Sequence, residues 1–211
     1  PNNLFTTLIS RAGDDGATFL RYIDRGQGQH YSAGDWKPSQ HTDQAMFSVP
    51  RTDIGQWVHL AGTYDGAAWR IYRNGRLVAS EATKRGAQSG KTKWTLGGPA
   101  DSNLPFYFHG DIDDVRVYGR ALSGDEIADL SALDDRATSS LPRSNMDGLL
   151  AHWTFDEGGG DVARDVVGGH HGAIKGATWT KGVHGAGLHF DGRSQVELGQ
   201  REDLNFAGPI T

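Results

Sequence analysis

The sequence predicts an all-β sandwich with one short helix, and three observations lead to this fold class. Glycine accounts for 30 of the 211 residues, roughly twice its usual ~7% share, and glycine is the residue of tight turns. Two hairpin dipeptides, Asp65-Gly66 and Asn74-Gly75, lie between short β-rich runs and suit type I′ turns. Residues 111–118 alternate in polarity with the two-residue period of a strand. Many short strands joined by tight turns are typical of a sandwich.

The expected elements follow one another closely along the chain. A polar, glycine-rich stretch at 25–44 is expected to be an irregular binding loop. Ser123 and Glu126 form an S-x-x-E capping box, which predicts one helix that runs to residue 133. The strands are expected at 4–9, 17–24, 57–64, 68–73, 76–80, 92–97 and 111–118, and after the helix at 149–156, 176–182, 187–192 and 195–199.

Composition narrows the class of function. The net charge is −5, with 26 acidic and 21 basic residues, and no basic run is present that would favour nucleic acid. No apolar stretch approaches the ~20 residues of a membrane span, so no membrane insertion is expected. Cysteine is absent, which removes disulfides and thiol chemistry.

Several motifs together resemble one known family. The run WVHLAGTYDGAAWRIYRNGRLVAS at 57–80 resembles the central part of laminin-G-like domains, and GDIDDVRVYGRALSGDEI at 110–127 resembles their closing part. Residues 149–192, with HWTFDEGGG and GLHFDG, resemble the family's opening part. The resemblance implies the antiparallel jelly roll of the concanavalin A-like lectin/glucanase superfamily. It also implies a non-catalytic binding module of a secreted bacterial protein, with carbohydrate as ligand.

The order of these parts departs from the family. Residues 1–133 carry the middle and closing parts, residues 134–147 are a polar linker, and residues 148–211 carry the opening part. Either the two pieces complete one sandwich as a circular permutant, or the chain is a window on tandem repeats. Physics favours a completed sandwich, because about four strands with one apolar face lack a partner sheet.

One strand of the family pattern, resembling S-x-x-A-W-V, is expected between Thr211 and Pro1, and neither end of the chain contains it. We therefore expect a gap between sheet edges, and exposed edges tend to pair with another chain. This expectation supports an alternative function. The chain would be a structural repeat unit of a bacterial surface or filament protein, assembled by strand exchange between neighbouring copies.

Calcium is the metal that the resemblance implies. An aspartate that opens the D-x-V-R strand is similar to a structural calcium ligand of related jelly rolls, and Asp113 holds that position. Asp156 and Asp191 follow strands that could approach it, and Ca²⁺ takes six to eight oxygen ligands. The alternative is that all three carboxylates cap backbone amides of their own turns.

The expected glycan platform is Trp36, on the stretch predicted to be a loop. Tyr31 and His30 are its aromatic neighbours, and polar groups for sugar hydroxyls are expected from Asp35, Gln40 and His41. The alternative is that Trp36 covers the edge of the core. Trp57 and Trp153 occupy family-like strand positions and are expected in the core.

Neither a transition-metal site nor an enzyme is expected. His170 and His171 are adjacent, and adjacent residues of an extended chain point to opposite faces, which makes poor chelation. The paired carboxylates of a glycosidase strand are missing from the sequence, as are the common nucleophile, zinc and phosphate motifs.

Overall fold

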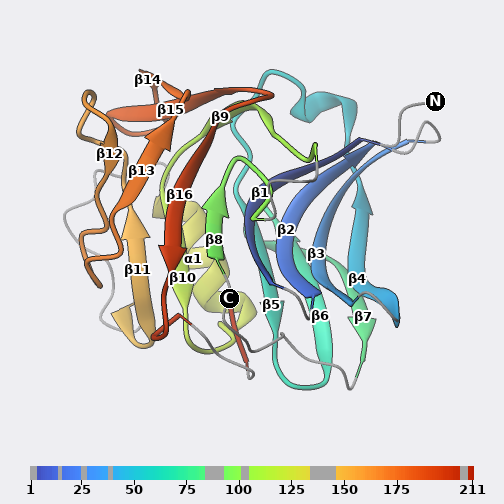
Figure 1. Ribbon diagram of the computed structural model, residues 1–211. Helices are drawn as coiled ribbons and strands as arrows, with labels where there is room; N and C mark the ends of the chain where they lie inside the picture. Colours follow the sequence, from blue (N-terminus) through green and yellow to red (C-terminus); the bar gives the residue numbers. More distant parts are fainter. Residues whose placement is uncertain are drawn as a thin grey trace.

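Antiparallel strands supply most of the regular structure (Figure 1). The computed structural model describes residues 4–13, 16–24, 28–37, 40–83, 93–100, 105–133, 146–204 and 209–211. Most of the predicted linker, at 134–145, lies outside these residues. No helix within the described ranges is long and apolar enough to cross a membrane.

One layer is a sheet of eight strands, to which both ends of the chain contribute. Its edge from 162 to 200 comes late in the sequence and its other edge comes early (Figure 1). In order across the sheet the strands are β12 (Val162–Ala163), β13 (Gly172–Lys175), β16 (Gln195–Gln200), β8 (Lys93–Leu96), β1 (Leu4–Gly13), β2 (Gly16–Asp24), β3 (Gln29–Lys37) and β4 (Gln40–Ser48).

The facing layer consists of three separate groups of strands. The first is β14 (Thr178–Lys181), β15 (Ala186–Asp191) and β9 (His109–Ile112); the second is β10 (Val115–Tyr118) and β11 (Leu149–Trp153); the third is β5 (Leu60–Tyr64), β6 (Ala68–Arg73) and β7 (Arg76–Ala82). A short 3₁₀ turn, η1 (Arg51–Asp53), precedes β5, and helix α1 (Gly124–Leu133) follows β10.

A single apolar core joins the two layers and the two parts of the chain. Val196 of β16 pairs with Leu96 of β8 in the large sheet, and Trp153 of β11 pairs with Val115 of β10 in the facing layer. These side chains belong to one cluster of contacting apolar residues, in which Trp153 is fully buried. The antiparallel sandwich expected from the sequence is therefore the observed fold.

The capping box at helix α1 is confirmed. The Ser123 hydroxyl accepts a hydrogen bond from the Glu126 amide at 3.2 Å, and the Glu126 carboxylate accepts one from the Ser123 amide at 2.8 Å. Hydrogen bonds from Arg120 are the main reason why the pKa of Glu126 falls to about 2. The helix buries Ile127 and Leu130 in a second apolar cluster, on the outer side of β10.

The prediction of an irregular loop at 25–44 is wrong. Residues 29–37 and 40–48 form β3 and β4, which pair with each other. Tyr31 and Ala33 face the core, whereas Ser32 between them does not belong to the apolar cluster. The alternation of a strand is therefore present, but few apolar residues mark it in this polar stretch. Gly34 is required by close packing, since a Cβ there would lie 2.3 Å from the Asp43 carbonyl oxygen.

The two predicted hairpin turns differ in outcome. Asn74 and Gly75 both have positive φ, 47° and 74°, as the type I′ prediction requires. At the other hairpin only Gly66 has positive φ. Asp65 instead accepts hydrogen bonds from the amides of Ala67 and Ala68, both at 2.9 Å, so the loop is longer than the predicted two-residue turn.

Candidate functional site

The candidate site is a slot between two strand edges in the facing layer. Strand β5 pairs with β6 on one side, and β10 pairs with β11 on one side. Their other edges face each other, and among the described residues only Ile210 and Thr211 lie between them. We call the space between β5 and β10 the strand slot.

The chain enters the strand slot at one end and bonds to both of its walls. Ile210 exchanges two backbone hydrogen bonds with Tyr64 of β5, at 2.8 and 2.9 Å. Thr211 exchanges two with Tyr118 of β10, at 2.8 and 3.3 Å. Ile210 bonds to one wall and Thr211 to the other. Because adjacent strands lie about 4.8 Å apart, the space between β5 and β10 at this end is the width of one strand.

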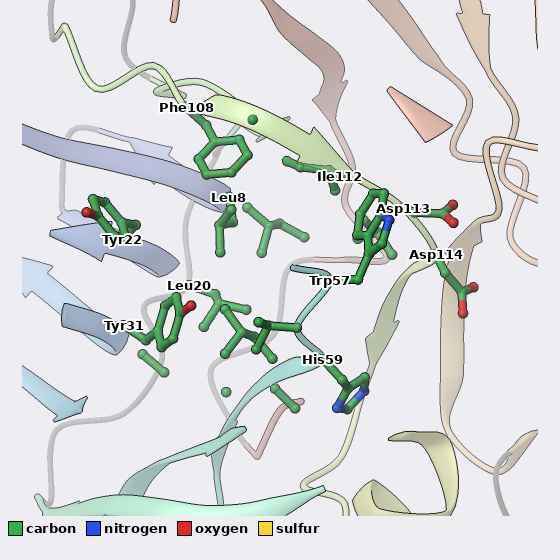
Figure 2. Close-up of a pocket in the computed structure, with 18 of the residues that line it drawn as sticks. Leu8, Leu20, Tyr22, Tyr31, Trp57, His59, Phe108, Ile112, Asp113 and Asp114 are labelled. Atoms are coloured by element: carbon green, nitrogen blue, oxygen red, sulfur yellow. The ribbon is translucent and has the colours of Figure 1, made fainter. Parts of the chain in front are cut away.

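Below the strand slot lies a cavity of about 940 Å³. Its floor is apolar and comes from the large sheet and from β9, with Leu8, Leu20, Phe108 and Ile112 among its side chains (Figure 2). Residues 60–62 of β5 and 115–118 of β10 line its walls. The cavity therefore lies between the two walls that Ile210 and Thr211 bridge at the entrance of the strand slot.

Both walls present backbone groups to the strand slot. In antiparallel pairing, alternate residues bond to the strand on one side and to the strand on the other. Because Tyr64 bonds to Ile210, the next residues of β5 that face the slot are Gly62 and Leu60. By the same alternation from Tyr118, the next residue of β10 that faces it is Arg116.

A polar cluster closes the far end of the strand slot. Asp114, with a positive φ of 53°, contacts the His152 ring at 2.5 Å and forms a salt bridge with Arg116 at 2.7 Å. Burial opposes ionisation of Asp114, but the His152 hydrogen bond and the Arg116 charge outweigh it and lower its pKa. Burial, together with the Arg116 charge, lowers the pKa of His59 to about 4, so its ring is neutral at pH 7.

Two polar atoms of this cluster have no partner. The Nδ1 atom of His59 and the Nε atom of Arg116 are buried and accept or donate no hydrogen bond among the described residues. Trp57, expected in the core, is instead 43% exposed and lines the strand slot beside His59 (Figure 2). The sequence motifs did not indicate a role for His59 or Arg116, because the cluster combines residues of β10 and β11 with residues that precede β5 and β10.

The structure places two of the three predicted calcium ligands beside one turn. Asp113 accepts hydrogen bonds from the amides of Val183 and His184, at 2.8 and 3.3 Å, through Oδ2. Its Oδ1 is buried without a partner among the described residues, and burial raises the pKa of Asp113 to about 6. A Cβ on Gly185 would lie 2.1 Å from Oδ1 of Asp156, so that carboxylate meets the same turn.

Asp191 does not join them. It ends β15, whereas the turn at 182–185 precedes the start of that strand, and it accepts a hydrogen bond from the Arg193 amide at 3.0 Å. Asp191 pairs with His109 and Leu188 pairs with Ile112, so Asp191 lies at the other end of β9 from Asp113, and its approach to Asp113 stays a prediction. Among the residues that the structure describes, no group of three or more His, Cys, Asp or Glu side chains could hold a metal ion.

The predicted glycan residues do not converge. Trp36 is 41% exposed, whereas Tyr31 and Asp35 are buried. Odd-numbered residues of β3 face the core and even-numbered ones face outward, and Tyr31 donates a hydrogen bond to Asp53 at 3.0 Å inside the sandwich. The side chains of Gln40 and His41 lie outside the described part of the chain.

His170 and His171 have structural partners. The His170 ring lies between the carboxylates of Asp165 and Asp203, each at 2.6 Å. Its carbonyl accepts the Trp153 indole N–H at 2.9 Å, and His171 accepts a hydrogen bond from the Asp165 amide at 3.1 Å. The pair thus joins the loop around Asp165 to Trp153 of β11 and to Asp203.

The structure is an antiparallel β-sandwich, and comparison with known proteins gives its family. The sequence pattern of the concanavalin A-like lectin/glucanases superfamily matches residues 2–128. The chain belongs to this superfamily, as a laminin-G-like domain.

A second comparison gives a distant relative. The chain is 34% identical over 110 residues to pappalysin-1 of Mus musculus, a match that covers 47% of the chain and 6% of pappalysin-1. The chain thus spans a small part of that relative's length. No solved structure gives a significant match.

Proposed function

We propose that this protein is a non-catalytic extracellular binding module whose strand slot takes up an extended polypeptide strand, so that neighbouring units are joined by strand addition. One observation carries the proposal: Ile210 and Thr211 pair with both walls of the slot at its entrance. Family membership supports the wider class, since laminin-G-like domains are generally binding modules outside the cell.

The size of the cavity supports a polypeptide occupant. The cavity of about 940 Å³ is partly open to solvent and runs between the walls of the strand slot. Water is a poor filler for an apolar floor, whereas a strand satisfies the wall amides and buries apolar side chains together.

In this proposal the donor strand continues the direction of Ile210 and Thr211 into the strand slot. The path of Ile210 and Thr211 already points into the slot, antiparallel to both walls. A strand continuing that path has its partners at a very high effective concentration. Residues 149–211 already supply six strands to the sandwich, and in an array the following strand would link one unit to the next.

A designed extension tests the proposal. The strand Val-Thr-Val-Ser-Val is appended after Thr211, which places valine at the inward positions by alternation from the buried Ile210. The control, Thr-Val-Ser-Val-Val, has the same composition with its pattern shifted by one residue. We expect the designed strand to raise the melting temperature by about 5 °C or more and the control to leave it unchanged. Equal melting temperatures for the two would contradict the proposal.

A second arm distinguishes the source of the strand. The same five residues are added as a free peptide to the unextended protein. We expect weak binding at most, because association costs several kcal/mol that the fused strand avoids. Tight binding of the free peptide, with chain-like oligomers on light scattering, would assign the slot to a strand from a separate molecule.

Calcium binding is proposed at the turn between Asp113 and Asp156. The buried, unpartnered Oδ1 of Asp113 and the carboxylate of Asp156 beside Gly185 supply hard oxygen ligands of the type that Ca²⁺ prefers. The ion would fix the turn at 182–185 against β9 and β10. We expect Ca²⁺ to raise the melting temperature of the protein and not that of Asp113→Asn; an equal rise in both would place the ion elsewhere.

Glycan binding at Trp36 is a second candidate function. Its support is the exposed indole on the outer face of β3, since sugar rings stack on exposed aromatic faces. A glycan array probed with the protein and with Trp36→Ala tests it. Glycan signal that the substitution abolishes would support this site, and an absence of signal would leave strand addition as the function.

A further inference from the structure

Two histidines are neighbours on the outer face of the strand group β14, β15 and β9. His109 belongs to β9 and His189 to β15, and the register pairs His189 with Asp111 and Asp191 with His109. Phe190 is fully buried, so by alternation the residues on either side of it face outward. The centres of the two histidine rings lie 6.0 Å apart, with their planes at 75°. Two imidazoles from the early and late parts of the chain thus share one surface.

Asp111 fixes the tautomer of His189. The Nδ1 atom of His189 lies 2.7 Å from Oδ1 of Asp111. A carboxylate ion can only accept a hydrogen bond, so Nδ1 carries the proton. In the neutral ring the lone pair is then on Nε2, and the side chains of both residues are 41% exposed. Histidines that bind a metal ion commonly donate their other N–H to a carboxylate in this way.

The spacing of the two rings suits one shared ion. With Zn–N bonds of about 2.0–2.1 Å, two imidazoles on a tetrahedral ion have ring centres about 5 Å apart. A small rotation of the exposed His109 side chain closes the difference from the observed 6.0 Å. The carboxylates of Asp111 and Asp191 lie on the same face and offset the charge of a dication.

We propose that His109 and His189 together bind one late first-row transition-metal ion, with Asp111 as the residue that orients His189. Imidazole nitrogen suits Cu²⁺ and Zn²⁺, and Cu²⁺ binds more tightly, whereas Ca²⁺ prefers oxygen. Water completes the coordination, since no group of three metal-binding side chains was found in the described part of the chain. The ion joins β9 of the early part to β15 of the late part.

Titration with Cu²⁺ in excess Ca²⁺, followed by electron paramagnetic resonance, tests the proposal. We expect one tightly bound Cu²⁺ per chain, with splitting from two imidazole nitrogens. His109→Gln and His189→Gln each keep one imidazole and are expected to weaken binding about 100-fold or more, because changes outside the ligands already cost about 10–100-fold. The matched control is His171→Gln, which removes an exposed imidazole elsewhere and should bind Cu²⁺ as the unchanged protein does.

Two results would overturn the site. One is Cu²⁺ affinity that His109→Gln or His189→Gln leaves unchanged, and the other is splitting from a single imidazole nitrogen. Asp111→Asn keeps an acceptor for the His189 N–H but removes the charge, so we expect binding about tenfold weaker and an unchanged melting temperature without metal. Equal affinity in that variant would overturn the role of Asp111.

The proposed site is independent of the calcium turn and of strand uptake. Asp113 lies beyond the opposite end of β9 from His109. Asp113→Asn should therefore bind Cu²⁺ as tightly as the unchanged protein. A loss of Cu²⁺ binding in Asp113→Asn, with binding retained in His109→Gln, would assign the ion to the calcium turn and overturn the histidine site.

Discussion

The early part of the chain (residues 1–133) and the late part (residues 148–211) are joined in different ways in the two layers of the sandwich. In the large sheet, β16 of the late part pairs directly with β8 of the early part, and the sheet is continuous across the junction. In the facing layer, β5 and β10 are separated, and Ile210 and Thr211 bridge them at one end. The same fold therefore has one closed junction and one open junction.

This difference shows that core burial and strand pairing are separable. At the closed junction Leu96 and Val196 are fully buried and their backbones are paired. At the open junction the side chains of Leu8 and Leu20 are partly buried, and among the described residues the backbone pairing between the walls is that of Ile210 and Thr211. The apolar core is therefore continuous across both junctions, whereas the backbone pairing is not.

The largest expected contrast is between two Leu→Ala substitutions. Leu96→Ala removes a fully buried side chain at the closed junction and is expected to lower the free energy of unfolding by about 2–5 kcal/mol. Leu20→Ala, at the floor of the strand slot, is expected to cost about 1 kcal/mol, because its surroundings are already open. Urea unfolding with matched m-values measures both, and equal costs would contradict the contrast.

The entrance of the open junction is the next most sensitive point. Ile210→Pro removes the amide that donates to the Tyr64 carbonyl and the buried Ile side chain, so we expect a loss of about 2 kcal/mol in unfolding free energy. Ile210→Val is the control and is expected to cost about 1 kcal/mol or less. If the proline variant matches the valine variant in chemical denaturation, the entrance pairing contributes nothing.

Acid should weaken the open junction through His59. Its folded pKa is about 4, and an unfolded histidine titrates near ~6.5. The unfolded state therefore binds more protons between these values, and stability from this group is lost as the pH falls from about 6.5 to about 4. His59→Gln should flatten the dependence of unfolding free energy on pH in that window; an unchanged slope would show that His59 is not held neutral.

The smallest expected effect lies outside both junctions. Ser123→Ala removes the cap of helix α1 and is expected to cost about 1 kcal/mol. Because α1 packs on the outer side of β10, the strand slot should keep its response to the designed extension. Thermal melts of the variant with and without the extension check this, and a lost response would mean that the helix holds the slot open.

Local patterns predicted local structure well. The capping box at Ser123 and the Asn74-Gly75 turn depend only on neighbouring residues, so both could be predicted from the sequence. The prediction of a loop at 25–44 was wrong because few apolar residues mark the strands there, and their structure depends on pairing with β2. Trp57 was predicted from its motif to lie in the core, but it is 43% exposed and lines the cavity below the strand slot.

The candidate site was predictable only in outline. The order of the motifs led us to expect a gap between sheet edges, but not which side chains surround it. Asp113 and Asp156 both lie beside the turn at 182–185. Asp191 lies at the far end of β15 from this turn. His59 and Arg116 come from different parts of the chain and are close enough for the Arg116 charge to lower the pKa of His59, a proximity that no spacing in the sequence predicts.

Residue-resolved amide hydrogen exchange tests the central claim most directly. In the unextended protein we predict slow exchange at Tyr64 and Tyr118, which pair with the chain end, and fast exchange at Gly62 and Arg116, whose amides face the strand slot. Appending the designed strand should slow exchange at Gly62 and Arg116. Strong protection of Gly62 and Arg116 before any strand is added would contradict an open slot, and unchanged fast exchange after its addition would contradict strand uptake.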